Sequence, residues 1–127
     1  GGHIAINLAS RMPQVQGLIF DCAFTSFIDI AKFKYPIISW LASRIVNQPY
    51  SAIDVIGELQ IPILAMHSQL DLSVPLRMGQ ALYGKIVHER KQNWWYSGGH
   101  LHSYLHPREF TTKVLEFIEQ YNLLSDE

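Results

Sequence analysis

The sequence has one cysteine, no long apolar run and no excess of charge of either sign. Because Cys22 is alone, an internal disulfide framework is excluded, which fits a reducing compartment. Ten Lys and Arg residues balance eleven Asp and Glu residues, so no basic stripe indicates nucleic-acid binding. Apolar runs such as Ile61–Met66 are short, far from the roughly 20 residues that span a bilayer. We therefore expect a packed domain that does not bind nucleic acid.

The sequence also lacks an initiator methionine and a signal peptide. It opens on Gly1-Gly2 and runs directly into a helical pattern, an unusual natural amino terminus. We interpret the chain as the truncated part of one domain. Any targeting segment or membrane anchor would precede Gly1, so the location stays open between the cytoplasm and a membrane surface. Membrane association of the intact protein is possible on this interpretation.

Apolar periodicity and proline positions predict alternating helices and short strands. A helix is expected from Ile4 to Met12, where Pro13 ends it. Further helices are expected to begin near Ser26, Pro36, Ser51, Pro75 and Pro107. Apolar runs predict three strands, at Val15–Phe20, Pro62–His67 and Asn93–Tyr96.

This alternation predicts an α/β fold with a mainly parallel sheet. Three strands are few for such a sheet, and the first would present an unpaired edge, which agrees with truncation. No internal repeat or linker divides the chain, so residues 1–127 are expected to form part of a single domain. Residues from about 26 to 59 lie between the first two strands and are expected to form a short helical lid.

Two loops follow strands and carry reactive side chains. Asp71 lies in the loop after the second strand, and His100 follows two glycines after the third. Ligands of open parallel sheets bind at the carboxyl ends of the strands, so we expect these two side chains to meet there. A carboxylate can hold the tautomer of an imidazole and stabilise the imidazolium. The imidazole can then take a proton from a nucleophile and return it to a leaving group.

The order of these motifs resembles the α/β-hydrolase superfamily. Its members have the motif H-G-x-x-D-x-x-V-P between a strand and a helix, and G-G-H after the next strand. In this chain the first motif reads His67-Ser68-Gln69-Leu70-Asp71-Leu72-Ser73-Val74-Pro75, and the second is Gly98-Gly99-His100. Gly17–Ser26 also resembles the family, and Gly1-Gly2 matches the end of its G-x-S-x-G elbow. The branch that the chain resembles most is the membrane-associated α/β-hydrolase-domain proteins, with bacterial serine-aminopeptidase-like hydrolases. The chain departs from the family at Ser68, where glycine is usual, and at Leu101-His102, where Asn-Asp is frequent.

The resemblance implies the carboxy-terminal half of a serine hydrolase with a Ser-Asp-His triad. Asp71 would be the acid and His100 the base, while the serine would lie two residues upstream of Gly1. The substrate would be a small molecule, an acyl compound or a peptide, with no cofactor and no metal. The fragment alone would be inactive. The alternative is a non-catalytic binding or scaffold protein on the same fold.

Other side chains offer competing interpretations. Asp21 is the second candidate for the acid, since some family members carry it after the preceding strand. A zinc site at His100, His102 and His106 is disfavoured, because no cysteine or acidic ligand accompanies this spacing. His67 is expected to hydrogen-bond the turn below Asp71, and His3 to face outward. Cys22 is interpreted as a small core residue, and neither Ser68 nor Ser97 is in the sequence context of a nucleophile.

Overall fold

The computed structural model describes residues 1–37 and 51–123. Its elements follow the expected order. The helices are α1 (Gly2–Arg11), α2 (Phe27–Lys34), α4 (Ala52–Val55), α5 (Leu76–Lys85) and α6 (Pro107–Gln120), with 3-10 turns η1 (Ile56–Glu58) and η2 (His102–Leu105). The strands are β1 (Leu18–Asp21), β2 (Ile63–Ser68) and β3 (Lys91–Tyr96). The turn η2 is absent from the sequence prediction, which has a loop there.

The three strands form one parallel sheet in the order β1-β2-β3. Met66 is paired with Asp21 on one side and with Trp94 on the other, so all three strands end at the same edge. The α/β fold class predicted from the sequence is thus confirmed. This shared edge is where the loops carrying Asp71 and His100 leave the sheet.

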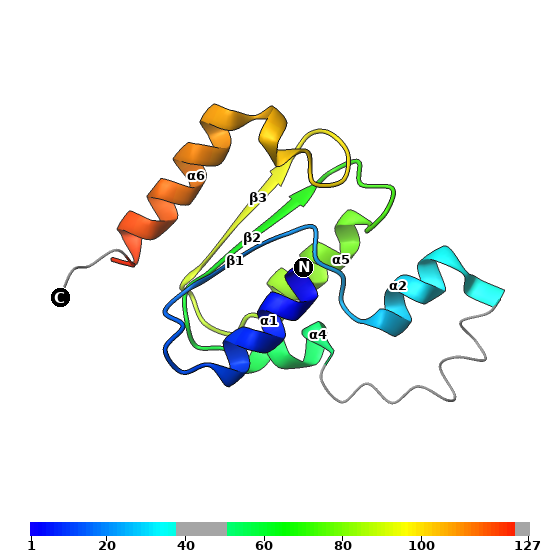
Figure 1. Cartoon of the computed structure of the whole chain (residues 1–127), viewed down its shortest axis with the longest axis horizontal. Coiled ribbons are helices and arrows are strands. Elements are labelled where there is room, and N and C mark those ends of the chain that lie inside the picture. The colour runs from blue at the N-terminus through cyan, green and yellow to red at the C-terminus, as the bar shows by residue number, and fades with distance from the viewer. Residues whose placement is uncertain (38–50, 124–127) are drawn as a thin grey trace.

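Helices cover both faces of the sheet, as Figure 1 shows. On one face α1, α4, η1 and α5 pack over Phe20, Ile63 and Ala65. On the other face α6 places the fully buried Phe117 against alternate residues of β2 and β3. Because successive side chains of a strand point to opposite faces, the apolar β2 serves both cores.

Local signals explain where several helices begin. Ser26 caps α2 by accepting a hydrogen bond from the Asp29 backbone amide at 2.9 Å. Pro107 occupies the first turn of α6, where its missing amide hydrogen costs nothing. The helix expected from Pro36 toward Arg44 lies mostly outside the described residues.

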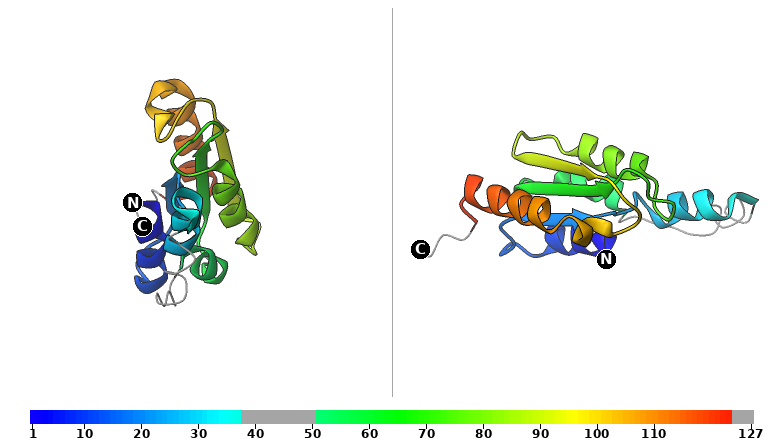
Figure 2. Two further views of the ribbon diagram at one scale, coloured as in Figure 1. Left: turned by 90° about the vertical axis from the view of Figure 1, so that its right-hand side faces the viewer. Right: turned by 90° about the horizontal axis from the view of Figure 1, so that it is seen from above.

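The region expected to be a lid divides into two described parts. Figure 2 shows α2 projecting past the carboxyl edge of the sheet. By contrast, α4 and η1 place Ala52, Val55 and Ile56 in the core. None of the described helices combines the length and the apolar character that crossing a bilayer requires.

Candidate active site

Asp71 lies in the loop between β2 and α5, with its side chain buried. Its Oδ1 accepts hydrogen bonds from the backbone amides of Ser73 and Val74, both at 2.8 Å. Burial alone would raise the pKa of this carboxyl. The amide of Val74, the ring of His100, the thiol of Cys22 and the amide of Ser73 oppose burial and outweigh it, so the pKa of Asp71 is lowered. The loop therefore holds a buried carboxylate in its ionised form.

His100 meets this carboxylate from the loop after β3. Its Nδ1 lies 2.6 Å from Asp71 Oδ2. Because an ionised carboxylate only accepts, Nδ1 carries the hydrogen and Nε2 is the basic nitrogen. The imidazole side chain is 35% exposed, so its ring faces a side of the molecule that a reactant can reach. Asp71 and His100 thus form the contact expected from the sequence.

The loop that carries His100 depends on two residues in left-handed conformations. Gly98 has φ +116°, a region that favours glycine, and Leu101 has φ +57°. The buried hydroxyl of Ser68 donates to the carbonyl of Gly98, which joins the end of β2 to this loop. Ser68 therefore ties the loop that carries Asp71 to the loop that carries His100.

His67 supports the loop that carries Asp71. Its Nε2 donates to the carbonyl of Val74 at 2.8 Å, which confirms the expected bond to the turn below Asp71. Burial lowers the pKa of His67, so its ring is neutral beneath the carboxylate. Its nearest nitrogen lies 3.6 Å from Asp71 Oδ2, farther than that of His100.

Asp21 does not contact His100 and belongs to a separate set of contacts. It accepts hydrogen bonds from the Tyr96 hydroxyl at 2.8 Å and from the Ser103 hydroxyl at 2.9 Å. Both of its oxygens are thereby engaged, so the geometry favours Asp71 over Asp21 as the acid. Neither Tyr96 nor Ser103 was a sequence candidate, because nothing in the spacing of the motifs points to them.

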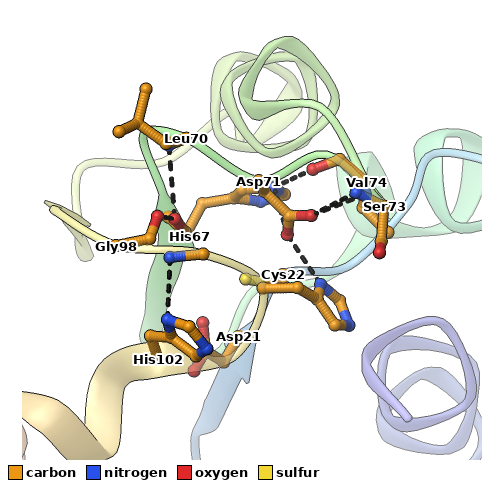
Figure 3. A network of polar contacts seen from close by, with 12 residues as sticks. Asp21, Cys22, His67, Leu70, Asp71, Ser73, Val74, Gly98 and His102 are labelled. Atoms are coloured by element: carbon orange, nitrogen blue, oxygen red, sulfur yellow. Dashed lines mark hydrogen bonds and ion pairs between the residues drawn. The ribbon is translucent and has the colours of Figure 1, made fainter.

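Cys22 lies between these two carboxylates, as Figure 3 shows. Its sulfur is 3.3 Å from the Tyr96 hydroxyl oxygen. Ligand atoms of Cys22, Asp71 and His100 all lie within 4.8 Å of one another, a set of types that zinc accepts. A metal there would have to separate the closely bonded Asp71 and His100 and ionise a thiol whose pKa burial raises to about 12. The arrangement therefore favours a protonated hydrogen-bond network over a metal site.

His102 and His106 were considered with His100 as zinc ligands on the basis of their spacing. Each of them instead forms a hydrogen bond to the backbone of the loop after β3. His102 Nδ1 accepts from the Gly99 amide at 2.9 Å. His106 Nε2 lies 2.7 Å from the Ser97 carbonyl oxygen. Each ring thus uses a nitrogen to hold the loop after β3.

The amino end of α1 packs close to the end of β1. A Cβ atom on Gly2 would lie 2.6 Å from the Cβ of Ala23, so only glycine permits this approach. Ala23 follows Cys22, whose sulfur lies within 4.8 Å of ligand atoms of Asp71 and His100, so α1 begins near this pair. The expectation that His3 faces outward is wrong: its ring is buried and accepts a hydrogen bond from the Ala52 amide at 3.2 Å, since it packs between α1 and α4.

A cavity of about 430 Å³ lies between α2, α4 and α5. Phe33, Ile53 and Met78 give it apolar walls, and Lys32, Asp29 and Arg77 add charges. Arg77 lies over the ring of Phe33, 5.3 Å from its centroid. Neither Asp71 nor His100 lines this cavity, so it is separate from the contact between those two residues.

Known proteins resemble the chain in sequence and in fold. It is 29% identical over 137 residues to the alpha/beta hydrolase domain-containing protein WAV2 of Arabidopsis thaliana, covering 95% of this chain and 44% of that protein. No family model matches. Among solved structures, the Pyrococcus furiosus esterase Pf2001 matches 94% of this chain and 50% of its own, with 16% identity and a TM-score of 0.75.

Two further solved structures match over nearly the whole chain. MGS-MChE2, an alpha/beta hydrolase enzyme from the metagenome of lagoon sediments at Mar Chica, Morocco, has 17% identity and a TM-score of 0.70, covering 96% of this chain and 58% of its own. The acylaminoacyl peptidase of Pyrococcus horikoshii has 18% identity and a TM-score of 0.64, and the match covers 93% of this chain and 22% of the peptidase chain. The chain thus spans between 22% and 58% of the lengths of these proteins.

Proposed function

We propose that this chain, which has part of the α/β-hydrolase fold, supplies the acid and the base of a serine hydrolase. The observation that carries the proposal is the 2.6 Å contact between His100 Nδ1 and a buried, ionised Asp71. A carboxylate bonded to Nδ1 fixes the tautomer in which Nε2 accepts a proton. That is the form of histidine a general base requires.

His100 then moves one proton twice. Its Nε2 takes the hydroxyl proton of the nucleophile as the oxygen attacks the substrate carbonyl, and the imidazolium is stabilised by Asp71. It next gives this proton to the leaving group, so an acyl-serine forms. Water repeats the sequence and releases the acid. Asp71 stays ionised throughout, in keeping with its lowered pKa.

The nucleophile in this proposal is a serine two residues upstream of Gly1. Two features support that position. Gly2 allows α1 to begin against Ala23, beside the pair, and glycines after the serine are what a tight strand-to-helix turn requires. The positive end of the α1 dipole would then favour the oxyanion that forms on the substrate carbonyl.

The bond hydrolysed would be an ester, a thioester or an amide. Two of the proteins with the same fold are described as an esterase and as an acylaminoacyl peptidase. Ester and amide substrates differ in the leaving group, but in this proposal both are cleaved through the same kind of acyl-enzyme. In the intact protein, α2 would cover part of the substrate from its place beyond the carboxyl edge of the sheet.

Ester turnover by the intact protein tests the proposal. The intact protein should hydrolyse a p-nitrophenyl ester, and His100→Ala should reduce kcat by about a millionfold, the effect of losing a triad histidine. His106→Ala is the matched control, because that ring bonds the same loop without contacting Asp71. A non-catalytic scaffold would give no turnover, and equal rates for His100→Ala and the parent would exclude His100 as the base.

A further inference from the structure

The candidate base His100 lies in a tight turn formed by residues 99–102. The backbone amide of His102 donates to the Gly99 carbonyl at 3.1 Å, which closes the turn around His100 and Leu101. Leu101 has φ +57°, and a positive φ at the third position of a turn is uncommon for a residue with a side chain. Such a conformation persists only where the surrounding contacts hold it.

The side chain of His102 supplies a second hydrogen bond across the same turn. The Gly99 amide donates to Nδ1 of His102 at 2.9 Å. Gly99 and His102 are therefore joined by one hydrogen bond in each direction, with His100 between them in the chain. The side chain of His102 also packs against the backbone before His100. A Cβ atom on Gly98 would lie 3.1 Å from the His102 Cβ, and one on Gly99 would lie 3.1 Å from its Cε1, so the two glycines leave the room that this side chain needs.

The hydrogen bond from Gly99 fixes the tautomer of the His102 ring. An Nδ1 that accepts a hydrogen bond carries no hydrogen, so a neutral His102 has its hydrogen on Nε2. His100 has the opposite tautomer, because its Nδ1 donates to Asp71 at 2.6 Å. Tyr104 packs edge-on against the His102 ring, with 5.7 Å between the centroids, and supports its orientation. The two histidines of this turn thus have different partners: His100 bonds the acid, and His102 bonds the backbone.

We propose that His102 is a positioning residue, whose Nδ1 holds the Gly99 amide and thereby fixes the turn that presents His100 to Asp71. The inference rests on the proposed function for its consequence in catalysis. The 2.6 Å contact between His100 and Asp71 requires a precise position of the turn. Without the acceptor on His102, the turn loses one of the two hydrogen bonds that join its ends, so the His100 ring should move away from the carboxylate.

Ring ¹⁵N shifts of the intact protein test the tautomer on which this role depends. At a pH at which both rings are neutral, they should show an unprotonated Nδ1 on His102 and a protonated Nδ1 on His100. A His102 ring with its hydrogen on Nδ1 cannot accept from Gly99 and would overturn the inference. The measurement does not require a nucleophile. An intact protein with the expected tautomers and no turnover would therefore contradict the proposed function and leave the role of His102 standing.

The hydrogen shared by His100 and Asp71 reports on the position of the base. It should give a low-field proton signal, which in His102→Ala should move upfield and exchange faster with water. In ester turnover, kcat of His102→Ala should fall roughly a hundredfold with KM unchanged, the effect of a small misplacement of a reacting group. His102→Asn should keep the signal and most of kcat, because the asparagine Oδ1 takes the place of Nδ1. His106→Ala is the matched control and should keep the parental signal, since that ring bonds the Ser97 carbonyl.

A folded His102→Ala protein with the parental signal and kcat would overturn the inference. An equal loss in His102→Asn would also overturn it, because the acceptor would then not be the cause. The same holds for an equal loss in His106→Ala, which would assign the effect to the loop as a whole. If His102→Ala does not fold, the tautomer of His102 in the parent and the signal of His102→Asn decide by these criteria.

Discussion

Replacing Asp71 by asparagine tests the acid with almost no change of shape. Oδ1 of Asp71 accepts two backbone amides, from Ser73 and Val74, so the asparagine must place its oxygen there. Its NH₂ group then takes the position of Oδ2, 2.6 Å from His100 Nδ1. Two donors cannot face each other, so His100 must move its hydrogen to Nε2.

That change of tautomer removes the base. An Nε2 that carries a hydrogen cannot accept one from a hydroxyl, so kcat of the intact protein should fall about 10⁴-fold, as for the equivalent change in other triads. A 10⁴-fold loss corresponds to about 5.4 kcal/mol of activation free energy. KM should change little, because Asp71 is buried away from substrate.

The assay is ester turnover combined with ¹⁵N shifts of the His100 ring, which distinguish the two tautomers. Asp21→Asn is the matched control, since Asp21 bonds Tyr96 and Ser103 and not His100, and it should keep most of the activity. A pure Asp71→Asn protein with near-normal rates would refute the reasoning and make Asp21 the acid candidate.

Four further outcomes are expected. The 127-residue chain alone should show no ester hydrolysis, and turnover that His100→Ala abolishes would contradict this. Because the pKa of Asp71 is lowered on folding, its stabilising contribution is complete above the unfolded value of about 3.9 and is lost as the pH falls through the folded pKa. As the pH is lowered from about 5 to about 2, the Tm of Asp71→Asn should therefore fall less steeply than that of the parent protein. Parallel curves of Tm against pH for the two proteins would contradict the lowered pKa of Asp71. Cys22 in the folded protein should react with iodoacetamide on the order of a thousandfold more slowly than in urea. The reason is that a pKa raised from 9.0 to about 12 lowers the fraction of reactive thiolate by about that factor. Leu82→Ala should lower the free energy of unfolding by about 2–5 kcal/mol, because Leu82 is fully buried, whereas Leu72→Ala at 88% exposure should change it by less than about 0.5 kcal/mol.

The sequence allowed the α/β alternation to be predicted because each signal is local. Pro107 and Ser26 mark helix starts by their own backbone chemistry, and the apolar run before His67 is a strand buried on both faces. The pairing of Asp71 with His100 was also predictable, since parallel strands bring the loops that follow them to one edge.

What sequence reasoning missed depends on where side chains point in three dimensions. Cys22 reads as a small core residue, but its sulfur lies 3.3 Å from the Tyr96 hydroxyl oxygen and within 4.8 Å of ligand atoms of Asp71 and His100. Tyr96 and Ser103 reach Asp21 from 75 and 82 positions away in sequence. His3 was misplaced because its partner is a backbone amide of α4, a contact that helical periodicity does not predict.

The most direct test of the central claim is mass spectrometry of the intact protein after reaction with a fluorophosphonate probe. The account predicts a single covalent adduct on the serine two residues upstream of Gly1, lost in His100→Ala and retained in His106→Ala. An intact protein that stays unmodified, or one labelled equally well without His100, would contradict the assignment of Asp71 and His100 as the acid and base of a serine hydrolase.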